Sequence, residues 1–320
     1  MKSISVIGCG RWGTFLGWYA AKYCADNVLM YDLKDSPLFI EMQKTRKNEY
    51  LELVDNMELT GDLEEALKND FIIISIGAQY FRGLCKELNE HDLTGKTFLL
   101  AMKGLEESSA KRLSVVMGEE ISQDVDVAVL AGPGHVQDYV KGAPSCVVID
   151  SADEVVKTRV VDFMNSELVR CYYGTDLVGT EIGAALKNVI GVAAGMLDGI
   201  GWQGLKGALM ARAPLEVGRF IETQGGKAKS AYGLAHLGDY EATLFSKYSH
   251  NRGFGEDFAK GKKFEKLAEG VATLKGIHDI CQRDEIDMPI CEAIYGVVYE
   301  GKDMKDEISK LFSRGVTKEF

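Results

Sequence analysis

The clearest candidate for a ligand-binding site in this chain is a glycine-rich turn near its beginning. Gly8, Gly10 and Gly13 form the pattern Gly-x-Gly-x-x-Gly, directly after a run of β-branched residues and before a helix-competent segment. In this context the first glycine permits a tight turn, the second lets the backbone approach a pyrophosphate, and the third lets the helix pack closely on the sheet. The phosphates would lie on N–H groups at the positive end of the helix. The pattern therefore predicts a dinucleotide site.

An acid at the end of the next predicted strand extends this prediction. The strand over 28–31 is followed by Asp32, nineteen residues after Gly13. A carboxylate at this place accepts hydrogen bonds from the ribose 2′-hydroxyl of NAD and repels a 2′-phosphate. We therefore expect NAD as the cofactor, with NADH preferred over NADPH.

A lysine in the second half of the chain is a candidate for proton transfer. Lys187 lies in the mainly apolar segment 182–196. Burial of an ammonium is costly unless it is paired or its pKa falls, and a lysine of lowered pKa can deliver a proton near neutral pH. Taken alone, a lysine that reaches solvent or pairs with a nearby acid such as Glu181 is the more common case.

Three further stretches carry polar groups suited to a ligand. Lys103 follows a predicted strand and so lies at the carboxyl edge of the sheet, where doubly wound folds bind ligands. The stretch 132–135, Gly-Pro-Gly-His, follows the next strand, and its N–H groups could face an anion. The segment 236–255 is too polar for a core helix and offers the groups expected around a small phosphorylated polyol. Singly, each stretch is more often a solvated loop, and we expect His135 and His236 to be hydrogen-bonded structural residues.

The elements that must position these residues divide the chain in two. Before about residue 172, strands alternate with helices, and several strands are continuous apolar runs, as is typical of strands covered on both faces. The strands are predicted over 4–7, 28–31, 71–76, 97–101, 126–130 and 145–149. Beyond that point the predicted helices are 182–196, 206–223, 256–260, 266–283, 289–299 and 303–312. We therefore predict an α/β protein, with a Rossmann doubly wound parallel sheet in 1–173 and an all-α domain in 174–320.

The composition argues against several classes of function. A net charge of −11 gives no general attraction for nucleic acid or acidic membranes, so an anionic substrate needs a local positive cluster. The chain starts directly with a strand and shows no apolar stretch of membrane-spanning length, so we expect neither a signal peptide nor membrane insertion. The seven cysteines are scattered, which is typical of reduced thiols in the cytoplasm, and we read Cys9 as a small filler. We also expect no metal site, because no His/Cys cluster has ligand spacing.

The order and spacing of many short motifs resemble the NAD(P)-dependent glycerol-3-phosphate dehydrogenases of the bacterial type, over nearly the whole chain. The motifs that carry the resemblance are 8–14, 102–105, 132–135, 179–182, 185–190, 238–239, 251–255, 268–271 and 286–290. The resemblance implies a Rossmann domain followed by a helical domain, with catalysis in the cleft between them. It also implies reversible reduction of dihydroxyacetone phosphate to sn-glycerol 3-phosphate for phospholipid synthesis, and a homodimer.

The same resemblance implies roles for individual residues. Lys187 falls on the lysine that gives the alcohol oxygen its proton, Asp239 on the acid paired with it, and Lys103 on a lysine that contacts substrate and cofactor. The other implied cofactor contacts are Gly8, Gly10, Arg11, Trp12, Gly13, Asp32, Val136 and Glu269. The other implied substrate contacts are Gly132, Gly134, Asn188, Thr243, Ser249, His250, Asn251 and Arg252.

The chain departs from the family pattern around the anion pocket. His250 stands where the family usually has an arginine that grips the substrate phosphate, while Gly204 and Gly134 replace a common asparagine and a common serine. Loss of the guanidinium would weaken phosphate binding about ten- to a hundredfold, unless Arg252 or Lys206 compensates.

These departures leave two alternatives open. One is a paralogous dehydrogenase of another phosphorylated or acidic hydroxy compound, with a remodelled anion pocket. The other is a non-catalytic NAD-binding regulator. The joint presence of Lys103, Lys187 and Asp239 argues against the regulator, because a sensor needs none of them.

Overall fold

The computed structural model describes residues 3–316 and 318–319. The chain divides into a sheet unit, 1–103 with 111–181, and a helical unit, 104–110 with 182–320. The sequence placed the boundary at 173/174, whereas the division falls within a long helix, α8 (Leu177–Gly199). The first turn of α8 stays with the sheet unit because Thr180 Oγ1 donates to Asp150 Oδ2 at 3.1 Å.

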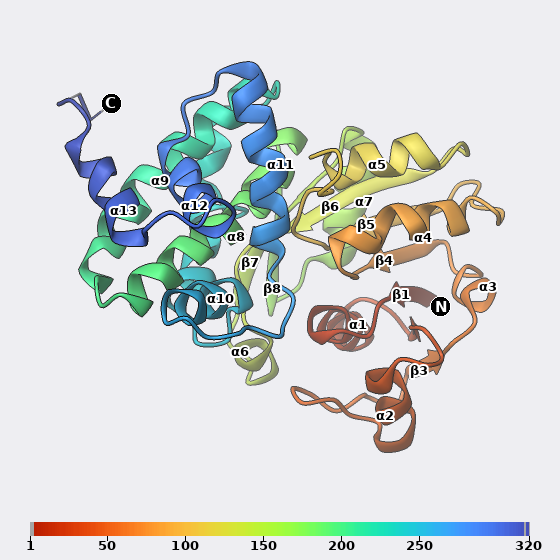
Figure 1. Ribbon diagram of the computed structural model, residues 1–320. Helices are drawn as coiled ribbons and strands as arrows, with labels where there is room; N and C mark the ends of the chain where they lie inside the picture. The colour runs from red at the N-terminus through yellow and green to blue at the C-terminus, as the bar shows by residue number, and fades with distance from the viewer. Residues whose placement is uncertain (1–2, 317, 320) are drawn as a thin grey trace. The chain divides into compact units, whose positions relative to one another are not determined.

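The sheet unit is built on one eight-stranded sheet (Figure 1). Its strands are β1 (Ser3–Ile7), β2 (Asn27–Tyr31), β3 (Met57–Thr60), β4 (Phe71–Ile74), β5 (Thr97–Leu100), β6 (Asp126–Ala131), β7 (Ser145–Asp150) and β8 (Val169–Tyr173). They lie in the order β3-β2-β1-β4-β5-β6-β7-β8. From β1 the chain first adds strands on one side and then, from β4, on the other, so the strand order reverses between β1 and β4. Doubly wound sheets bind ligands outside the carboxyl ends of the strands at such a reversal.

Two features of the sheet differ from the sequence prediction. The pair β6 and β7 is antiparallel, whereas all other neighbours are parallel. Strands β3 and β8 were not predicted. Both are edge strands whose side chains are only partly buried, so they lack the continuous apolar run that marks a covered strand.

Helices cover both faces of the sheet, which explains the apolar runs. They are α1 (Arg11–Tyr23), α2 (Pro37–Thr45), α3 (Leu63–Ala66), α4 (Phe81–Leu88), α5 (Leu113–Glu120), α6 (Val136–Val140), α7 (Glu154–Met164) and the short η1 (Ala78–Tyr80). On β4, Ile73 packs into the core beneath α1 and α7, whereas Ile72 and Ile74 pack into the core beneath α4 and α5. The predicted Rossmann arrangement is thereby confirmed.

The helical unit contains six longer helices and no strand among its described residues. The longer helices are α8, α9 (Lys206–Thr223), α10 (His250–Ala259), α11 (Glu269–Asp284), α12 (Pro289–Val298) and α13 (Met304–Ser313). Short helical turns join them: η2 (Gln203–Leu205), η3 (Ala228–Tyr232), η4 (Leu237–Asp239) and the π-helical η5 (Glu241–Phe245). Helix α10 starts six residues before the predicted 256, because Ser249 caps it.

Helix α8 corrects one expectation. Over its most apolar window it is long and apolar enough to cross a membrane, by length and composition alone. The expectation that no stretch reaches this length was therefore wrong. Inside the structure 89% of that window is buried, as in the core helix of a globular domain.

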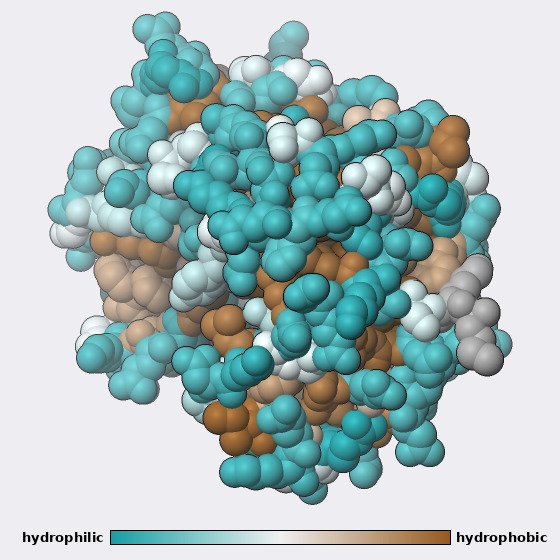
Figure 2. All heavy atoms as spheres, turned by 90° about the vertical axis from the view of Figure 1, so that its right-hand side faces the viewer, coloured by the Kyte–Doolittle hydropathy of each residue, from teal (hydrophilic) through white to brown (hydrophobic). Residues whose placement is uncertain are grey.

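The surface agrees with the charged composition. On the face that lies to the right in Figure 1, hydrophilic residues cover most of the area and hydrophobic ones are interspersed among them (Figure 2). Charged residues make up 27% of the chain.

Candidate active site

The glycine turn after β1 has the geometry that a bound dinucleotide requires. Gly8 has a φ of +106°, and a Cβ on it would overlap the backbone carbonyl of Ser75. A Cβ on Gly13 would overlap the carbonyl oxygen of Gly8, so this glycine lets α1 lie against the turn. A Cβ on Gly10 would meet nothing within 4 Å, which leaves the backbone there open to a ligand. Each of the three positions therefore favours glycine for a different physical reason.

Asp32 lies beside this turn at the end of β2. Its Oδ2 accepts a hydrogen bond from the N–H of Cys9 at 2.7 Å, and its Oδ1 accepts one from Leu33 at 2.8 Å. A carboxylate has about four acceptor positions, so both oxygens can still accept from ribose hydroxyls. Burial, and then the charge of Asp32, raise the pKa of the Cys9 thiol, which fits its interpretation as a small filler.

Arg11 and Trp12 are the first two residues of α1, and their side chains are the other candidate cofactor contacts at the turn. The guanidinium of Arg11 lies 5.7 Å from the ring of Tyr50, and the ammonium of Lys103 lies 5.4 Å from the ring of Trp12. The indole Nε1 of Trp12 is buried and has no hydrogen-bond partner among the described residues. An open glycine, a helix start, an anchored acid and this buried donor together fit a dinucleotide cofactor.

Lys103 and the glycines that follow β6 form a second group in the sheet unit. The ammonium of Lys103 donates to the carbonyl oxygen of Gly132 at 2.8 Å. Gly134 has a φ of +151°, and a Cβ on it would overlap the ring of Tyr139. The ring of Tyr139 thus fills the space that a side chain at position 134 would need. Val136 begins α6 with its side chain in the core, so only its backbone can meet a cofactor.

Lys187 is held out of water in the helical unit by a carboxylate and a hydroxyl. Its Nζ lies 2.6 Å from Asp239 Oδ2 and 2.9 Å from Thr243 Oγ1. All three residues are buried, at 7%, 1% and 2% exposure. The other acid considered for it, Glu181, instead accepts from Arg112 at 2.6 Å. Thr243 lies in a π-helical turn, a local irregularity that often occurs at functional sites.

The polar segment predicted to meet the substrate opens α10. The Ser249 hydroxyl accepts the N–H of Arg252 at 3.3 Å and so caps the helix, and His250 and Asn251 form its first turn. The first N–H groups of a helix and its positive dipole end favour an anion. The segment therefore offers a hydroxyl, an imidazole and an amide at a helix start.

The start of α11 fixes this segment from one side. Asn251 Oδ1 accepts from the N–H of Gly270 at 2.9 Å. A Cβ on Gly270 would lie only 2.5 Å from the carbonyl oxygen of Asn188, so α11 starts in close contact with α8 one residue after Lys187. Glu269, the predicted cofactor contact, is the first residue of α11.

Comparisons with known proteins decide the family. A family model described as the N-terminus of NAD-dependent glycerol-3-phosphate dehydrogenase matches residues 3–157, and the corresponding C-terminus model matches residues 176–309. The chain belongs to the NAD-dependent glycerol-3-phosphate dehydrogenase family. The expected family, its oxidoreductase class and its dependence on NAD(P) are thus confirmed.

Individual relatives agree with this assignment. The chain is 32% identical to a glycerol-3-phosphate dehydrogenase [NAD(P)+] of Clostridium botulinum, over 98% of each chain. It is 35% identical to one of a Thermotoga species, again over 98% of each chain. Among solved structures, a glycerol-3-phosphate dehydrogenase from Coxiella burnetii superposes with a TM-score of 0.90 at 24% identity, covering 98% of this chain and 99% of that one. This last similarity supports the fold.

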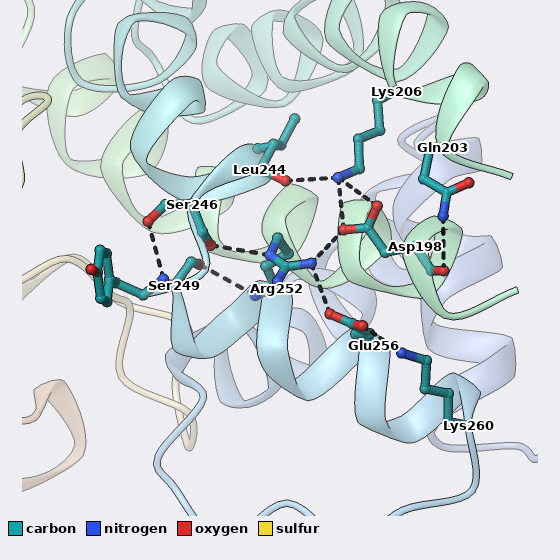
Figure 3. A network of polar contacts seen from close by, with 10 residues as sticks. Asp198, Gln203, Lys206, Leu244, Ser246, Ser249, Arg252, Glu256 and Lys260 are labelled. Carbon is teal, nitrogen blue, oxygen red and sulfur yellow. Dashed lines mark hydrogen bonds and ion pairs between the residues drawn. The ribbon is translucent and has the colours of Figure 1, made fainter. Parts of the chain in front are cut away.

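The sequence left open whether Arg252 or Lys206 compensates for the arginine that His250 replaces. In the structure both side chains pair with acids (Figure 3). Asp198 contacts both Lys206 Nζ, at 2.7 Å, and Arg252 Nη1, at 2.5 Å. Arg252 also contacts Glu256 Oε2 at 2.9 Å, and its Nε donates to the carbonyl oxygen of Ser246 at 3.1 Å. The charges of Arg252 and Lys206 are thereby balanced within the helical unit.

Sequence reasoning missed two members of these networks. Asp198 was not predicted as a partner of Arg252, although an acid near the end of an apolar helix is a visible signal. Tyr240 was not predicted at all. Its hydroxyl lies 2.6 Å from Nε2 of His236, which is fully buried and bonded at both ring nitrogens, so the expectation of a structural histidine is confirmed.

A groove of about 850 Å³ in the helical unit lies apart from these residues. It is lined by α8, α9, α12, α13 and the segment after α13. None of the predicted site residues lines it.

The glycine turn generates a prediction with an internal control. Gly13→Ala should lower the free energy of unfolding by about 1–3 kcal/mol, because its methyl group overlaps the Gly8 carbonyl. Gly10→Ala should leave stability within about 1 kcal/mol, because its methyl group meets open space, yet should weaken NADH binding. Denaturant unfolding and NADH fluorescence titration measure the two effects. A folded Gly10→Ala protein with unchanged NADH affinity would contradict the proposed cofactor position.

Proposed function

We propose that this chain catalyses the reversible reduction of dihydroxyacetone phosphate to sn-glycerol 3-phosphate with NADH, for glycerophospholipid synthesis. Membership of the family supports the reaction. The observation that carries the proposal is the buried ion pair of Lys187 and Asp239, with Nζ and Oδ2 2.6 Å apart. A protein that only bound the cofactor as a sensor would not need a buried lysine paired with a carboxylate.

The reduction adds a hydride to the carbonyl carbon and a proton to the carbonyl oxygen. The nicotinamide cofactor, when bound, supplies the hydride. Lys187 donates the proton from Nζ, and in the reverse direction the neutral amine accepts it. Contacts with Asp239 and Thr243 orient Nζ of Lys187. Asp239 keeps the ammonium charged until the transfer.

The remaining residues bind and orient. Gly8, Gly10 and Gly13 hold the pyrophosphate, Asp32 the ribose hydroxyls, and Arg11, Trp12, Val136 and Glu269 complete the cofactor contacts. For the substrate, Ser249, His250 and Asn251 hold the phosphate at the start of α10, aided by Asn188, Thr243, Gly132 and Gly134. Lys103 polarises the carbonyl or holds the phosphate. Arg252 contributes by fixing α10 through Asp198 and Glu256.

A second candidate function concerns the substrate. Because Asp198 holds both Lys206 and Arg252, neither replaces the arginine that His250 displaces. This favours, as the alternative, a dehydrogenase with the same proton chemistry and a different phosphorylated or acidic hydroxy compound.

We also propose a cytoplasmic location and a homodimer. Seven free cysteines, most of them buried, support a reducing compartment. The dimer follows from the family resemblance, and its mass in solution would be twice 35.2 kDa.

The assignment of Lys187 predicts a large and selective loss of turnover. Lys187→Met should lower kcat for dihydroxyacetone phosphate by about 10²–10⁴-fold, the usual contribution of a positioned proton donor. The affinity for NADH should not change. The matched control is Lys275→Met, at an exposed lysine on α11 of the same unit. NADH oxidation with a panel of keto-phosphates measures the activity of both variants. An undiminished kcat in Lys187→Met would refute the role of Lys187 as proton donor. If the wild-type enzyme reduced another ketone and not dihydroxyacetone phosphate, the alternative function would be selected.

Asp32 predicts cofactor choice. The ratio of kcat/KM for NADH to that for NADPH should be well above one, because the anchored carboxylate repels a 2′-phosphate. In Asp32→Ser the ratio should fall toward one. Equal efficiency of the wild-type enzyme with both cofactors would overturn this prediction.

His250 predicts a gain of function. His250→Arg should raise kcat/KM for dihydroxyacetone phosphate about ten- to a hundredfold, since it restores a guanidinium for the phosphate. Steady-state assays at fixed NADH measure the change. Unchanged or lower kcat/KM would count against this view of the anion pocket.

A further inference from the structure

A fully buried histidine joins the turn that carries Asp239 to the helix that carries Lys187. His236 Nδ1 lies 2.9 Å from the carbonyl oxygen of Gly183 on α8, and His236 Nε2 lies 2.6 Å from the hydroxyl of Tyr240. The two rings meet edge to face, with centroids 4.9 Å apart. The side chain of His236 has no exposed surface. The link is therefore shielded from competing water.

The two contacts fix the proton position on the imidazole. A carbonyl oxygen can only accept, so Nδ1 carries the proton and donates to Gly183. Because burial lowers the pKa of His236, the ring carries only this one proton near neutral pH, and Nε2 is the acceptor for the Tyr240 hydroxyl. The ring is neutral, and both of its nitrogen atoms are satisfied.

The point of attachment is one helical turn before the catalytic lysine. In an α-helix the carbonyl of Gly183 also accepts the backbone N–H of Lys187, four residues later. There is little room for adjustment, because a Cβ on Gly183 would lie 3.1 Å from the Cβ of His236. His236 therefore touches the same peptide group that sets the backbone position of Lys187.

The same histidine also sets the position of the acid. The N–H of Asp239 donates to the carbonyl oxygen of His236 at 3.0 Å, in the 3₁₀ turn η4. One residue thus bonds through its side chain to the lysine helix and through its backbone to the carboxylate residue. The 2.6 Å separation of Lys187 Nζ from Asp239 Oδ2 spans these two attachments.

Burial keeps the ring neutral. Burial, and to a smaller extent the ammonium of Lys187, lower the pKa of His236 to about 4, whereas the hydrogen bond that it donates to the Gly183 carbonyl and the charge of Asp239 raise it. Beyond Tyr240 lie Glu216 of α9 and Cys291 of α12, and burial raises the Tyr240 pKa well above its usual value. Neither ring changes charge near neutral pH.

We propose that His236, with Tyr240 behind it, is a positioning residue that holds Asp239 against Lys187 for proton transfer. The inference rests on the proposed role of Lys187 as proton donor. If the link is lost, Asp239 can move away from the ammonium, and Lys187 then loses its proton at lower pH. Reduction needs the protonated lysine, so the alkaline limb of the kcat profile reports the link.

Three substitutions separate the parts of the link. His236→Leu removes both bonds at similar volume. His236→Asn keeps a donor near the position of Nδ1 and removes the bond to Tyr240. Tyr240→Phe removes only the hydroxyl. The matched control is His278→Leu, at a histidine on α11 whose Nδ1 faces Glu292 at 3.3 Å.

The expected order follows from the bond to Gly183. In His236→Leu, kcat should fall about tenfold or more with little change in KM, and the alkaline limb should move to lower pH. His236→Asn should recover most of kcat and the wild-type limb, and Tyr240→Phe should show a smaller shift. His278→Leu should leave the limb in place. A wild-type profile in His236→Leu, or equal impairment of His236→Asn and His236→Leu, would overturn the proposal.

A readout without substrate keeps this test separate from that of the reaction. In protein labelled with ¹³C at lysine Cε, the pH titration of the Lys187 signal, assigned with Lys187→Arg, reports its protonation directly. The proposal requires that this titration move to lower pH in His236→Leu and stay in place in His278→Leu. If the wild type did not reduce dihydroxyacetone phosphate, the reaction assignment would fail, while a shifted titration would still support the link. An unshifted titration in folded His236→Leu would sink the link alone.

Discussion

The structure of the helical unit depends on one buried ion pair. Taking an ammonium and a carboxylate out of water costs several kcal/mol per ion, and their attraction offsets this only with good geometry and further hydrogen bonds. Lys187 and Asp239 meet both conditions, at 2.6 Å and with Thr243 as a second partner for the ammonium. Breaking such a pair from one side typically costs about 3–5 kcal/mol. The turns around Asp239 must therefore be held firmly, and π-helical η5 and the bonds of His236 do this.

A second cluster of charges holds the segment predicted to bind the substrate. Asp198, at the end of α8, contacts one cation from α9 and one from α10 (Figure 3). Asn251 adds a bond from the first turn of α10 to α11. The start of α10 is thus bonded to α8 and α11, and through Asp198 it is linked to α9, before any ligand binds, which limits the entropy that binding must remove. The same ion pairs balance the charges of Arg252 and Lys206 within the helical unit.

Local features of the sheet unit were predictable, and features set by distant partners were not. The glycine turn was found because the spacing of its glycines between a strand and a helix is a local pattern, although the carbonyl that a Cβ on Gly8 would overlap belongs to the distant Ser75. Gly134 was noted as a departure, but its reason, the ring of Tyr139, required coordinates. The edge strands β3 and β8 lack an apolar run and were missed, and nothing in the sequence marks β7 as antiparallel to β6.

The sequence by itself determined the family, most of the strands and helices in their order along the chain, the glycine turn, and Lys187 as the candidate proton donor. The residues alone left the partner of that lysine open, the family resemblance pointed to Asp239, and the tertiary structure shows why Asp239 and not Glu181 pairs with it. Glu181 is six residues from Lys187 on one helix, so the two side chains point to different faces, and Arg112 takes the carboxylate. Asp239 is far away in sequence and reaches Lys187 because the chain folds back through His236. Spacing along the chain fixes what a helix face presents, whereas pairing across the core depends on which elements pack together.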